Sequence, residues 1–378
     1  MDLHGPAIRD RIGDARVLVI GAAGSIGAAF VRVLAGHRLA ALHLVDLSEN
    51  GLVEVVRDLR SSGTPLPDDF ATFAVDFGAP EFAELLTDRR YDYVLNFSAL
   101  KHVRSERDRY TLMRMLRTNV LANEDLAGAL RDRPPRTLFS VSSDKAVRPG
   151  NLMGASKAFM ERVLLATADE VPFNSARFAN VAFSAGSLLD GFGHRIAKRQ
   201  PLSAPSDVRR FFISHEEAGQ LCFLGCFLGG NREIFYPKLD ADADMLSFAD
   251  IARTVLRHRG YEPMESASEE EALRAAANMP ADPTRWPCYF SGSDTAGEKP
   301  FEEFVDPRES TDETRYERCG VVTSPIDHGV EPVRQATNQI RTASARGHWT
   351  KSELADAVRT AVPELDHVES DRNLDQKM

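Results

Sequence analysis

The sequence has few cysteines and no Cys-x-x-Cys pair among them. Only four of its 378 residues are cysteine: Cys222 and Cys226 stand one helical turn apart in an apolar segment, and Cys288 and Cys319 stand alone. Cysteines in such settings are typical of buried free thiols rather than of metal ligands. The sequence therefore predicts reduced thiols, no metal site and a cytoplasmic protein.

Long hydrophobic runs and an excess of positive charge are also missing. The most apolar stretches, such as VLVIGAAGSIGAAF, are broken by glycine and too short to cross a bilayer, and the N-terminal segment lacks the apolar core of a signal peptide. With 46 Lys and Arg against 56 Asp and Glu, the formal net charge is -10. Such a chain offers no basic surface to nucleic acid. We therefore expect no membrane span and no nucleic-acid partner.

The first half of the chain contains a regular alternation of β-rich runs and helical patterns. Strands that alternate with helices in this way indicate βαβ units, and hence an α/β fold with a Rossmann-type, doubly wound parallel sheet. The predicted strands are VLVIGA (17–22), LHLVD (42–46), TFAVDF (72–77), YVLNFSA (93–99), TLFSVSS (137–143) and SARFANV (175–181).

The alternation becomes irregular after residue 184, which indicates a change of domain. We expect a first domain over residues 1–183, a smaller C-terminal domain over 184–345 with segments that return to pack on the first, and a helical, partly disordered tail over 346–378. The acidic, proline-bounded stretch MESASEEEALRAAANMPADPTRWP in the second domain predicts a surface insertion.

A glycine-rich loop, GAAGSIG, stands between the first predicted strand and the helix that follows it. Its glycines permit a tight turn and let the backbone approach a pyrophosphate that sits on the helix N-terminus. Three glycines arise by chance in many chains, but a strand before them and a helix after them point to dinucleotide binding. The loop residues predicted to bind the cofactor are Gly21, Ala23, Gly24, Ser25, Ile26 and Gly27.

Carboxylates follow this loop at the ends of the next two predicted strands. Asp46 can accept hydrogen bonds from both ribose hydroxyls and would repel a 2′-phosphate, which favours NAD over NADP. Ser48 lies in the same turn and is predicted to contact the cofactor. Asp76 and Phe77 are placed to meet the adenine. Each aspartate side chain could instead hydrogen-bond only to the backbone of its own turn.

Eight motifs occur in one order along the chain: GAAGSIG, VDLSENGLVEVVRDL, NFSALKHV, TNV, SSDKAVRPGNLMGASKAFME, RFANV, RRFFIS and AGEKPFEEF. Together they resemble the extended short-chain dehydrogenases/reductases of the polysaccharide-biosynthesis group, in particular the UDP-N-acetylglucosamine 4,6-dehydratases. The resemblance implies a Rossmann domain that binds NAD, a smaller C-terminal domain that binds a UDP-sugar, and a homo-oligomer. Members of this group often carry an N-terminal membrane portion, and we expect this chain to be the form without one.

The resemblance also implies a reaction. A 4,6-dehydratase oxidises C4 of the hexose, eliminates water across C5 and C6, and returns the hydride to C6. Elimination needs a general base at C5 and a general acid at the C6 hydroxyl, held close together. By resemblance, Asp144 is the acid, Lys145 is the base and Ser143 hydrogen-bonds the C4 oxygen. The alternative for Asp144 and Lys145 is an ion pair at the surface of a loop.

Methionine stands where most short-chain dehydrogenases carry a catalytic tyrosine. Met153 precedes Lys157 by one helical turn, and its thioether transfers no proton. Part of the dehydratase group carries methionine in the same MGASK setting, so an inactive site does not follow. Lys157 is expected to hold the nicotinamide ribose, and the C4 proton to leave through Ser143, Lys157 or water. Removing the Met153 side chain should then lower turnover only mildly; the alternative is a surface lysine beside a core methionine.

Further contacts are implied by the resemblance alone. For the cofactor they are Ser98, Ala99, Lys101 and Asn119, and for the substrate Lys101, His102, Asn180, Arg210 and Glu298. Arg210 suits a bidentate phosphate contact, whereas Asn119 could support the active-site backbone or merely pack a helix. The chain reads Thr-Ala-Gly-Glu-Lys over residues 295–299, where the group usually reads Arg-Pro-Gly-Glu-Lys, so one positive group at the nucleotide is missing.

Two other functions compete with that of a dehydratase. A C4 epimerase shares the oxidation, has little use for an acid–base pair at Asp144 and Lys145, and usually retains the tyrosine. A catalytically silent regulator that binds NAD and a nucleotide would account for Met153 but leaves that pair unused. We therefore expect an NAD-dependent hydro-lyase that converts UDP-N-acetylglucosamine, or a close UDP-hexose, to a 4-keto-6-deoxy product.

Overall fold

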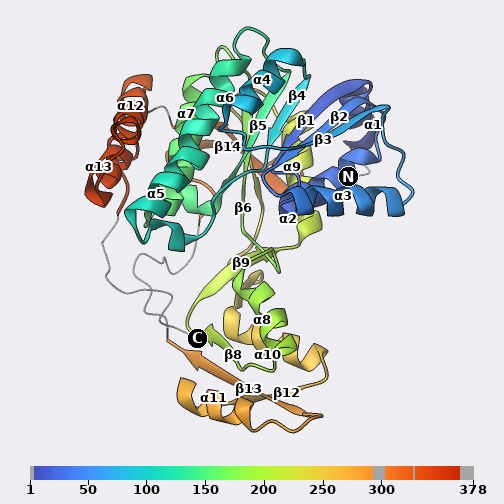
Figure 1. The fold of residues 1–378 in the computed structure, drawn as a ribbon, viewed down its shortest axis with the longest axis vertical. Coiled ribbons are helices and arrows are strands. Elements are labelled where there is room, and N and C mark those ends of the chain that lie inside the picture. The colour runs from blue at the N-terminus through green and yellow to red at the C-terminus, as the bar shows by residue number, and fades with distance from the viewer. Residues whose placement is uncertain (1–3, 293–302, 327, 367–378) are drawn as a thin grey trace. The chain divides into compact units, whose positions relative to one another are not determined.

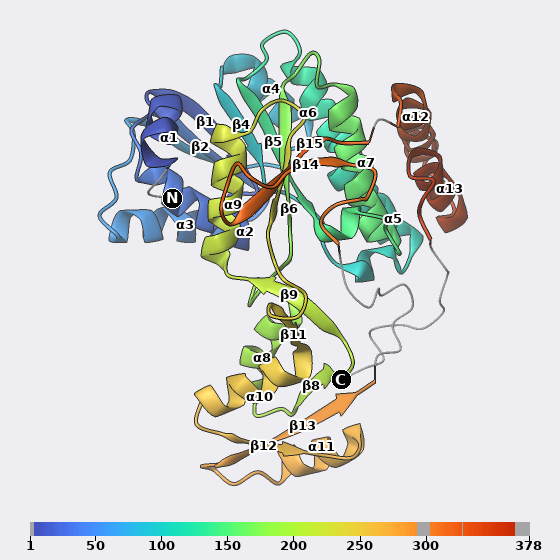
Figure 2. The same ribbon diagram turned by 180° about the vertical axis from the view of Figure 1, so that it is seen from behind.

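The described residues of this computed structural model form two compact units (Figures 1 and 2). The residues that the structure describes are 4–292, 303–326 and 328–366. The first unit comprises residues 4–178, 215–238 and 303–366, and the second comprises residues 179–214 and 239–292. The first unit ends at residue 178 and resumes twice later in the chain. The domains expected from the sequence, with boundaries at residues 183 and 345 and segments that return to the first domain, stay a prediction.

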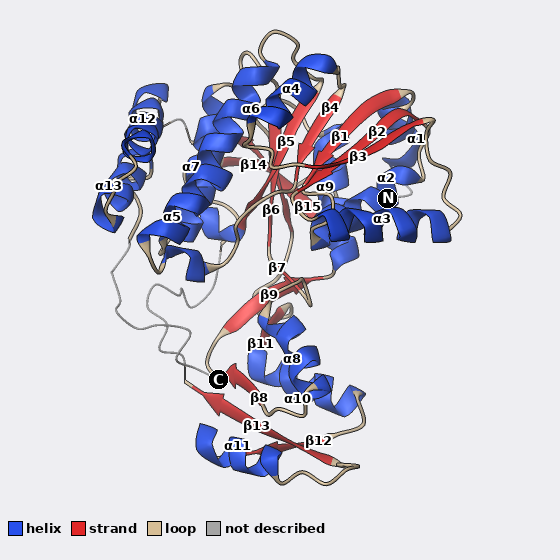
Figure 3. Cartoon of the chain, viewed as in Figure 1, coloured by secondary structure: helices blue, strands red, loops and turns tan. Residues whose placement is uncertain are grey.

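The first unit contains a nine-stranded sheet, formed by the described residues, with helices on both faces (Figure 3). Seven parallel strands follow the order β3-β2-β1-β4-β5-β6-β10, and β15 runs antiparallel to both β10 and β14. This arrangement confirms the predicted α/β, doubly wound fold. The strands are β1 Ala15–Ile20, β2 Leu39–Asp46, β3 Asp69–Ala74, β4 Tyr93–Asn96, β5 Thr137–Ser143, β6 Phe173–Phe178, β10 Ile234–Pro237, β14 Ser310–Asp312 and β15 Cys319–Ser324.

Burial of apolar strands and capping of helices explain these elements. Every residue of β4 and β6 is buried, as expected for parallel strands covered on both faces. The side chains of Ser48, Asp108 and Asn151 accept hydrogen bonds from first-turn N–H groups and so cap α3, α5 and α7. The helices of this unit are α1 Gly5–Ile12, α2 Ser25–Ala35, α3 Glu49–Ser61, α4 Pro80–Asp88, α5 Arg109–Leu116, α6 Ala122–Leu130, α7 Leu152–Ala166, α9 His215–Leu228, α12 Val330–Arg346 and α13 Lys351–Ala361, with short turns η2 Val103–Glu106, η3 Arg117–Leu121 and η4 Asp144–Ala146.

The second unit contains two three-stranded sheets and has its own apolar core. The stretch predicted to be a surface insertion is part of this core, since it supplies a strand, a helix and a further strand. Glu270 and Glu271 are exposed, but Ala272 and Trp286 are buried, so the acidic composition describes only one face of the helix. The elements of this unit are β7 Asn180–Val181, α8 Leu188–Ala197, β8 Leu202–Pro205, β9 Arg209–Ile213, β11 Met245–Ser247, α10 Phe248–His258, β12 Glu262–Glu265, α11 Glu269–Ala277 and β13 Arg285–Ser291.

Two further sequence predictions can be compared with the structure. The predicted strand over residues 175–181 is divided, because β6 ends at Phe178 and β7 pairs with β9 in another sheet. All four cysteines are free and buried, as predicted, and Cys222 and Cys226 both lie in α9. Within the described ranges no helix is long and apolar enough to cross a membrane.

Candidate active site

The glycine-rich loop lies at the carboxyl end of β1 and leads directly into α2. Gly21 has a φ of 73°, and a Cβ there would lie 2.6 Å from the backbone nitrogen of Ser98. A Cβ on Gly27 would lie 2.1 Å from the carbonyl oxygen of Gly21. Gly24, which has no side chain to cap the helix, is the N-cap of α2, and Ser25 begins the helix. The backbone of this turn packs too closely to leave room for side chains at Gly21 and Gly27, and the turn ends at the N-terminus of α2. Such a turn fits a pyrophosphate.

Asp46 ties the end of β2 to this loop. Its Oδ2 accepts a hydrogen bond from the Ala23 backbone N–H at 2.9 Å, and its Oδ1 accepts from the Ser48 N–H at 2.8 Å. Asp76 forms the Asx turn that was its alternative role, since its Oδ1 accepts from the Gly78 N–H at 2.9 Å. Both aspartates nevertheless line the same cavity, where a carboxylate can also accept from a ligand.

The cavity has a volume of about 420 Å³ and lies at the carboxyl ends of β1 to β4. Ligands of doubly wound folds bind at this edge of the sheet. The predicted cofactor residues that line it are Gly21, Asp46, Asp76, Phe77, Ser98 and Ala99. Sequence reasoning missed the lining residues from α5, η3 and the turn before α13, which are Tyr110, Met113, Arg114, Arg117, Thr118 and Trp349. No motif marks these residues, and they lie far from the glycine loop in sequence.

Asn119 positions the backbone beside this cavity. Its Oδ1 accepts from the Leu100 N–H at 2.8 Å, and its Nδ2 donates to the Leu100 carbonyl and the Ser156 hydroxyl, both at 2.9 Å. These bonds use both hydrogens of the amide, so Asn119 holds the loop after β4 against α7 instead of donating to a cofactor. Of the neighbouring predicted contacts, Lys101 and His102 are exposed on that loop.

Ser143, Asp144 and Lys145 stand together at the carboxyl end of β5. Asp144 Oδ1 accepts from the Ser143 hydroxyl at 2.7 Å, from the Lys145 backbone N–H at 2.8 Å and from Lys145 Nζ at 3.0 Å. Asp144 Oδ2 is buried and has no hydrogen-bond partner among the described residues. The Asp144 side chain is only 1% exposed, so this is not the surface ion pair considered as the alternative.

Lys157 and Met153 lie on α7, and both are buried. Lys157 Nζ donates to the Val141 carbonyl of β5 at 2.8 Å. Burial lowers the pKa of Lys157 from 10.5 to about 8, and Glu161 opposes the shift. Lys157 is therefore buried, and the alternative of a surface lysine is wrong.

Met153 is 4% exposed and belongs to an apolar cluster formed mainly by α5, α7, α12 and α13. Because the side chain is buried, truncating Met153 should leave a cavity and lower the free energy of unfolding by about 2–5 kcal/mol. The expected mild effect on turnover stays a prediction. The Met153 backbone N–H donates to Glu106 Oε2 at 3.1 Å. Burial raises the pKa of Glu106. Sequence reasoning missed Glu106, which holds the first turn of α7 in place.

The predicted substrate contacts Asn180 and Arg210 lie in the second unit, on the paired strands β7 and β9. Asn180 Nδ2 donates to the Phe211 carbonyl at 3.3 Å, and Arg210, which is 4% exposed, donates to the Arg209 carbonyl at 2.9 Å. Glu298 lies outside the described residues. All three substrate contacts stay predictions. In the described parts of the chain, no group of three or more His, Cys, Asp or Glu side chains could hold a metal ion.

A family profile described as "polysaccharide biosynthesis protein" matches residues 17–324, which is most of the chain. The chain belongs to this polysaccharide biosynthesis family. Among relatives, an uncharacterized membrane protein of Methanocaldococcus jannaschii is 28% identical over 260 residues, which are 66% of this chain and 74% of the relative. The probable polysaccharide biosynthesis protein EpsC of Bacillus subtilis is 27% identical over 276 residues, 72% of this chain but only 45% of EpsC.

Solved structures with the same fold include members with different reactions. Pen from Bacillus thuringiensis has a TM-score of 0.67 at 20% identity, covering 83% of this chain and 90% of Pen. The dTDP-glucose 4,6-dehydratase DesIV of Streptomyces venezuelae, solved as a double mutant with NAD, has a TM-score of 0.58 at 19% identity, covering 77% and 88%. A UDP-glucose 4-epimerase of Thermotoga maritima, solved with UDP-glucose, has a TM-score of 0.57 at 16% identity, covering 78% and 90%. These scores establish the fold and do not separate a dehydratase from an epimerase.

Proposed function

We propose that this member of the polysaccharide biosynthesis family is an NAD-dependent sugar-nucleotide 4,6-dehydratase, acting on UDP-N-acetylglucosamine or a close UDP-hexose. The observation that carries the proposal is the Ser143–Asp144–Lys145 group at the end of β5, with a buried carboxyl oxygen left unbonded by the described residues. The glycine loop and Asp46 support a dinucleotide at the neighbouring strand ends, and the structural relative DesIV was solved with NAD.

The geometry of Asp144 suits a general acid. Its Oδ1 accepts three hydrogen bonds, whereas its Oδ2 makes none with the described residues, so a proton on Oδ2 would point away from the Ser143 and Lys145 contacts. Asp144 would give this proton to the departing C6 hydroxyl. The acid must stand next to the base, because C5 and C6 are adjacent carbons.

Lys145 suits the base because its amine lies 3.0 Å from Asp144 and its side chain is 22% exposed, so it can reach a substrate. After elimination Lys145 carries the C5 proton and Asp144 has lost one. Lys145 would return its proton to C5 when the hydride returns to C6, and the proton that leaves the C4 hydroxyl balances the one that Asp144 has lost. Ser143 would hydrogen-bond the C4 oxygen, and the Lys157 ammonium would stabilise negative charge on it. NAD, when bound, accepts the hydride from C4 and returns it to C6.

The second candidate is a C4 epimerase, which the likeness to UDP-glucose 4-epimerases favours. One such enzyme, from Rickettsia prowazekii, is 33% identical over 157 residues, although these are only 40% of this chain. An epimerase oxidises and reduces the same carbon, so it needs no acid at C6. Asp144 would then be a buried carboxyl without a task, which is costly to maintain.

A product assay with UDP-N-acetylglucosamine tests the proposal. We expect mass spectrometry to show loss of one water, and deuterium placed on C4 to appear on C6, because the same hydride is removed and returned. An isomer of unchanged mass would establish the epimerase instead. No product from UDP-N-acetylglucosamine, UDP-glucose or dTDP-glucose, by a protein that binds NAD, would favour the silent regulator.

Cofactor preference provides a separate test of Asp46. We expect NAD to bind at least tenfold more tightly than NADP, roughly 1.4 kcal/mol, since a 2′-phosphate would meet this carboxylate. Calorimetry with both cofactors measures the ratio. Asp46→Asn should reduce the ratio, because the amide removes the charge but can still accept from the Ala23 N–H. Asp169→Asn, at a side chain that is 88% exposed, is the matched control. Equal affinities in the wild type would overturn the role given to Asp46.

A further inference from the structure

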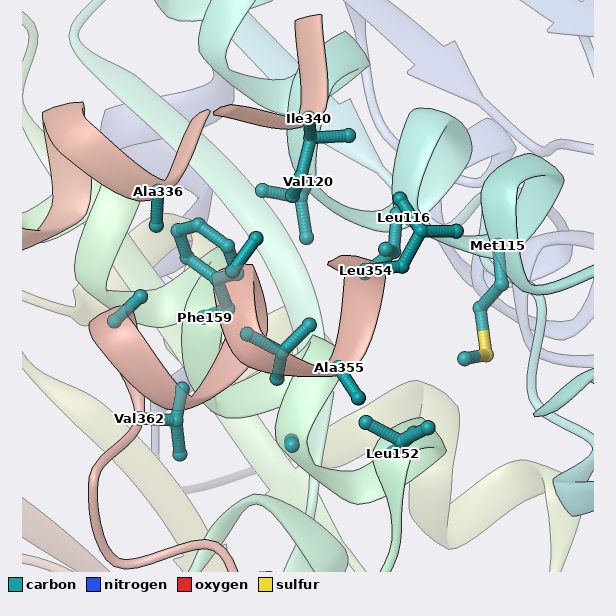
Figure 4. Packing of buried hydrophobic residues seen from close by; sticks show 14 of the residues in the cluster. Met115, Leu116, Val120, Leu152, Phe159, Ala336, Ile340, Leu354, Ala355 and Val362 are labelled. Carbon is teal, nitrogen blue, oxygen red and sulfur yellow. The ribbon is translucent and has the colours of Figure 1, made fainter. Parts of the chain in front are cut away.

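Helices α12 and α13 form a hairpin that packs on the rest of the first unit through the same apolar cluster that contains Met153. Figure 4 shows Ile340 of α12 near Val120, and Leu354 of α13 near Leu116. Polar contacts reinforce the packing: Arg341 of α12 forms ion pairs with Glu124 and Asp125 of α6. The hairpin is thus firmly attached to the helices beside the cavity.

The turn between the two helices carries Trp349, and its position is fixed on both sides. Gly347 ends α12 in the left-handed conformation at a φ of 73°, and Thr350 begins α13 with a capping box that includes Glu353. Trp349 Nε1 donates to the Arg109 carbonyl at 2.9 Å, and Arg109 Nη1 donates to the Trp349 carbonyl at 3.4 Å. This reciprocal pair holds the indole at the start of α5, where it lines the cavity.

A second residue links the cavity to the hairpin. Arg117 lines the cavity from η3, and its guanidinium donates to the Ser344 hydroxyl of α12, with Nε at 3.2 Å. The hairpin therefore contributes one wall residue directly and holds another by a hydrogen bond. A ligand that fills the cavity would contact both, so its binding energy would depend on the hairpin being in place.

The chemistry of the lining indicates which part of a ligand faces the hairpin. Leu47 and Tyr110 are each 64% exposed, and both line the cavity with Trp349. The aromatic rings of Tyr110 and Trp349 are the kind of surface that stacks on a nucleobase, and Leu47 adds apolar surface beside them. The Asp46 and Asp76 carboxylates in the same cavity can accept from hydroxyl and amino groups. Together these groups fit an adenosine.

We infer that Trp349 forms part of the binding site for the adenosine half of the dinucleotide, so that NAD binding and attachment of the C-terminal hairpin stabilise each other. The inference rests on the proposed function to the extent that the cavity takes NAD. Trp349 lies 303 positions after Asp46 in the chain numbering, so the cofactor would join the first and the last parts of the first unit.

Tryptophan fluorescence tests this inference without reference to activity. The chain has two tryptophans, and the other one, Trp286, lies in the core of the second unit. In Trp286→Phe all indole emission comes from Trp349, whereas in Trp349→Phe it comes from Trp286. We expect NAD and ADP to change the emission of Trp286→Phe saturably, with the dissociation constants that calorimetry gives. Nicotinamide mononucleotide should leave it unchanged, and NAD should leave the emission of Trp349→Phe unchanged.

Affinity provides the second measurement. Trp349→Ala should weaken NAD and ADP binding by about tenfold or more, the scale of one lost stacking contact, while Trp349→Phe should retain most of the affinity. NAD binding that leaves Trp349 emission unchanged, or a Trp349→Ala variant of wild-type affinity, would overturn the inference and leave the proposed function intact. If calorimetry detected no NAD binding to the wild type, the proposed function would fail and this inference with it.

Discussion

Asp144→Asn and Lys145→Met should each lower dehydratase turnover by about a hundredfold or more, which is the usual contribution of a positioned proton donor or acceptor. The asparagine keeps the shape of the buried side chain but has no acidic proton to give to the C6 hydroxyl. The methionine keeps the length of the lysine but cannot accept the C5 proton. Steady-state kinetics with UDP-N-acetylglucosamine measures both effects.

The double variant distinguishes a coupled pair from two independent residues. Because Lys145 Nζ lies 3.0 Å from Asp144 Oδ1, the two side chains should act as a unit. Their losses should then fail to add, so that the double variant is little slower than the worse single variant. NAD affinity should stay near that of the wild type throughout, since neither residue lines the cavity at the ends of β1 to β4.

Exposed residues of the same types provide matched controls. Asp169→Asn and Lys198→Met make the same chemical changes at exposed positions and should leave turnover unchanged. Normal turnover in Asp144→Asn or in Lys145→Met would show that the residue concerned has been given the wrong role. Loss of NAD binding in either variant would instead point to a general disturbance of β5 and η4.

Features carried by local pattern could be predicted from the sequence. The parallel sheet could be predicted because apolar runs alternate with helices. The glycine loop could be predicted because its turn needs glycine: a Cβ on Gly27 would meet the Gly21 carbonyl. The position of Asp46 at the cavity could be predicted, because the carboxyl ends of strands in such sheets face the ligand. In each case a few neighbouring residues determine both the local structure and its position relative to the sheet.

Features that depend on contacts between distant segments could not be predicted in this way. Trp349 reaches the cavity only because the hairpin packs on α5 and α7, and a lone tryptophan between two amphipathic helices carries no pattern that reveals this. The burial of Met153 has the same origin, since the hairpin supplies part of its surroundings. The hydrogen bonds that occupy the amide of Asn119 could not be predicted either, because they depend on Ser156 of α7.

Lys157 is the residue for which stability and activity should change in opposite directions. Its ammonium is buried, and burial lowers its pKa from 10.5 to about 8. A native state that binds the proton less tightly than the unfolded chain is destabilised below pH 8, by about 3 kcal/mol for a shift of this size. The penalty disappears as pH rises from about 8 to 10.5, because the native state then releases a proton that the unfolded chain still holds.

Lys157→Met removes this penalty and also removes the catalytic charge. We expect the variant to be more stable than the wild type at pH 7, with the difference in unfolding free energy shrinking by about 3 kcal/mol between pH 8 and 10.5. Denaturant unfolding at a series of pH values measures this difference, in which the titration of all other groups cancels. Turnover should fall by roughly a hundredfold or more, because no positive charge remains beside the C4 oxygen.

Two controls separate the charge of Lys157 from its neighbourhood. Met153→Leu conserves volume in the cluster on the same helix, so it should keep both stability and turnover within a small factor. Lys198→Met removes an exposed ammonium and should leave no pH-dependent difference. If the difference in unfolding free energy between Lys157→Met and the wild type stays constant from pH 7 to 11, the buried amine is not the source of the destabilisation. Wild-type turnover in Lys157→Met would show that another group accepts the C4 proton and stabilises the charge on the C4 oxygen. A large loss of turnover in Met153→Leu would show that the methionine has a role beyond packing.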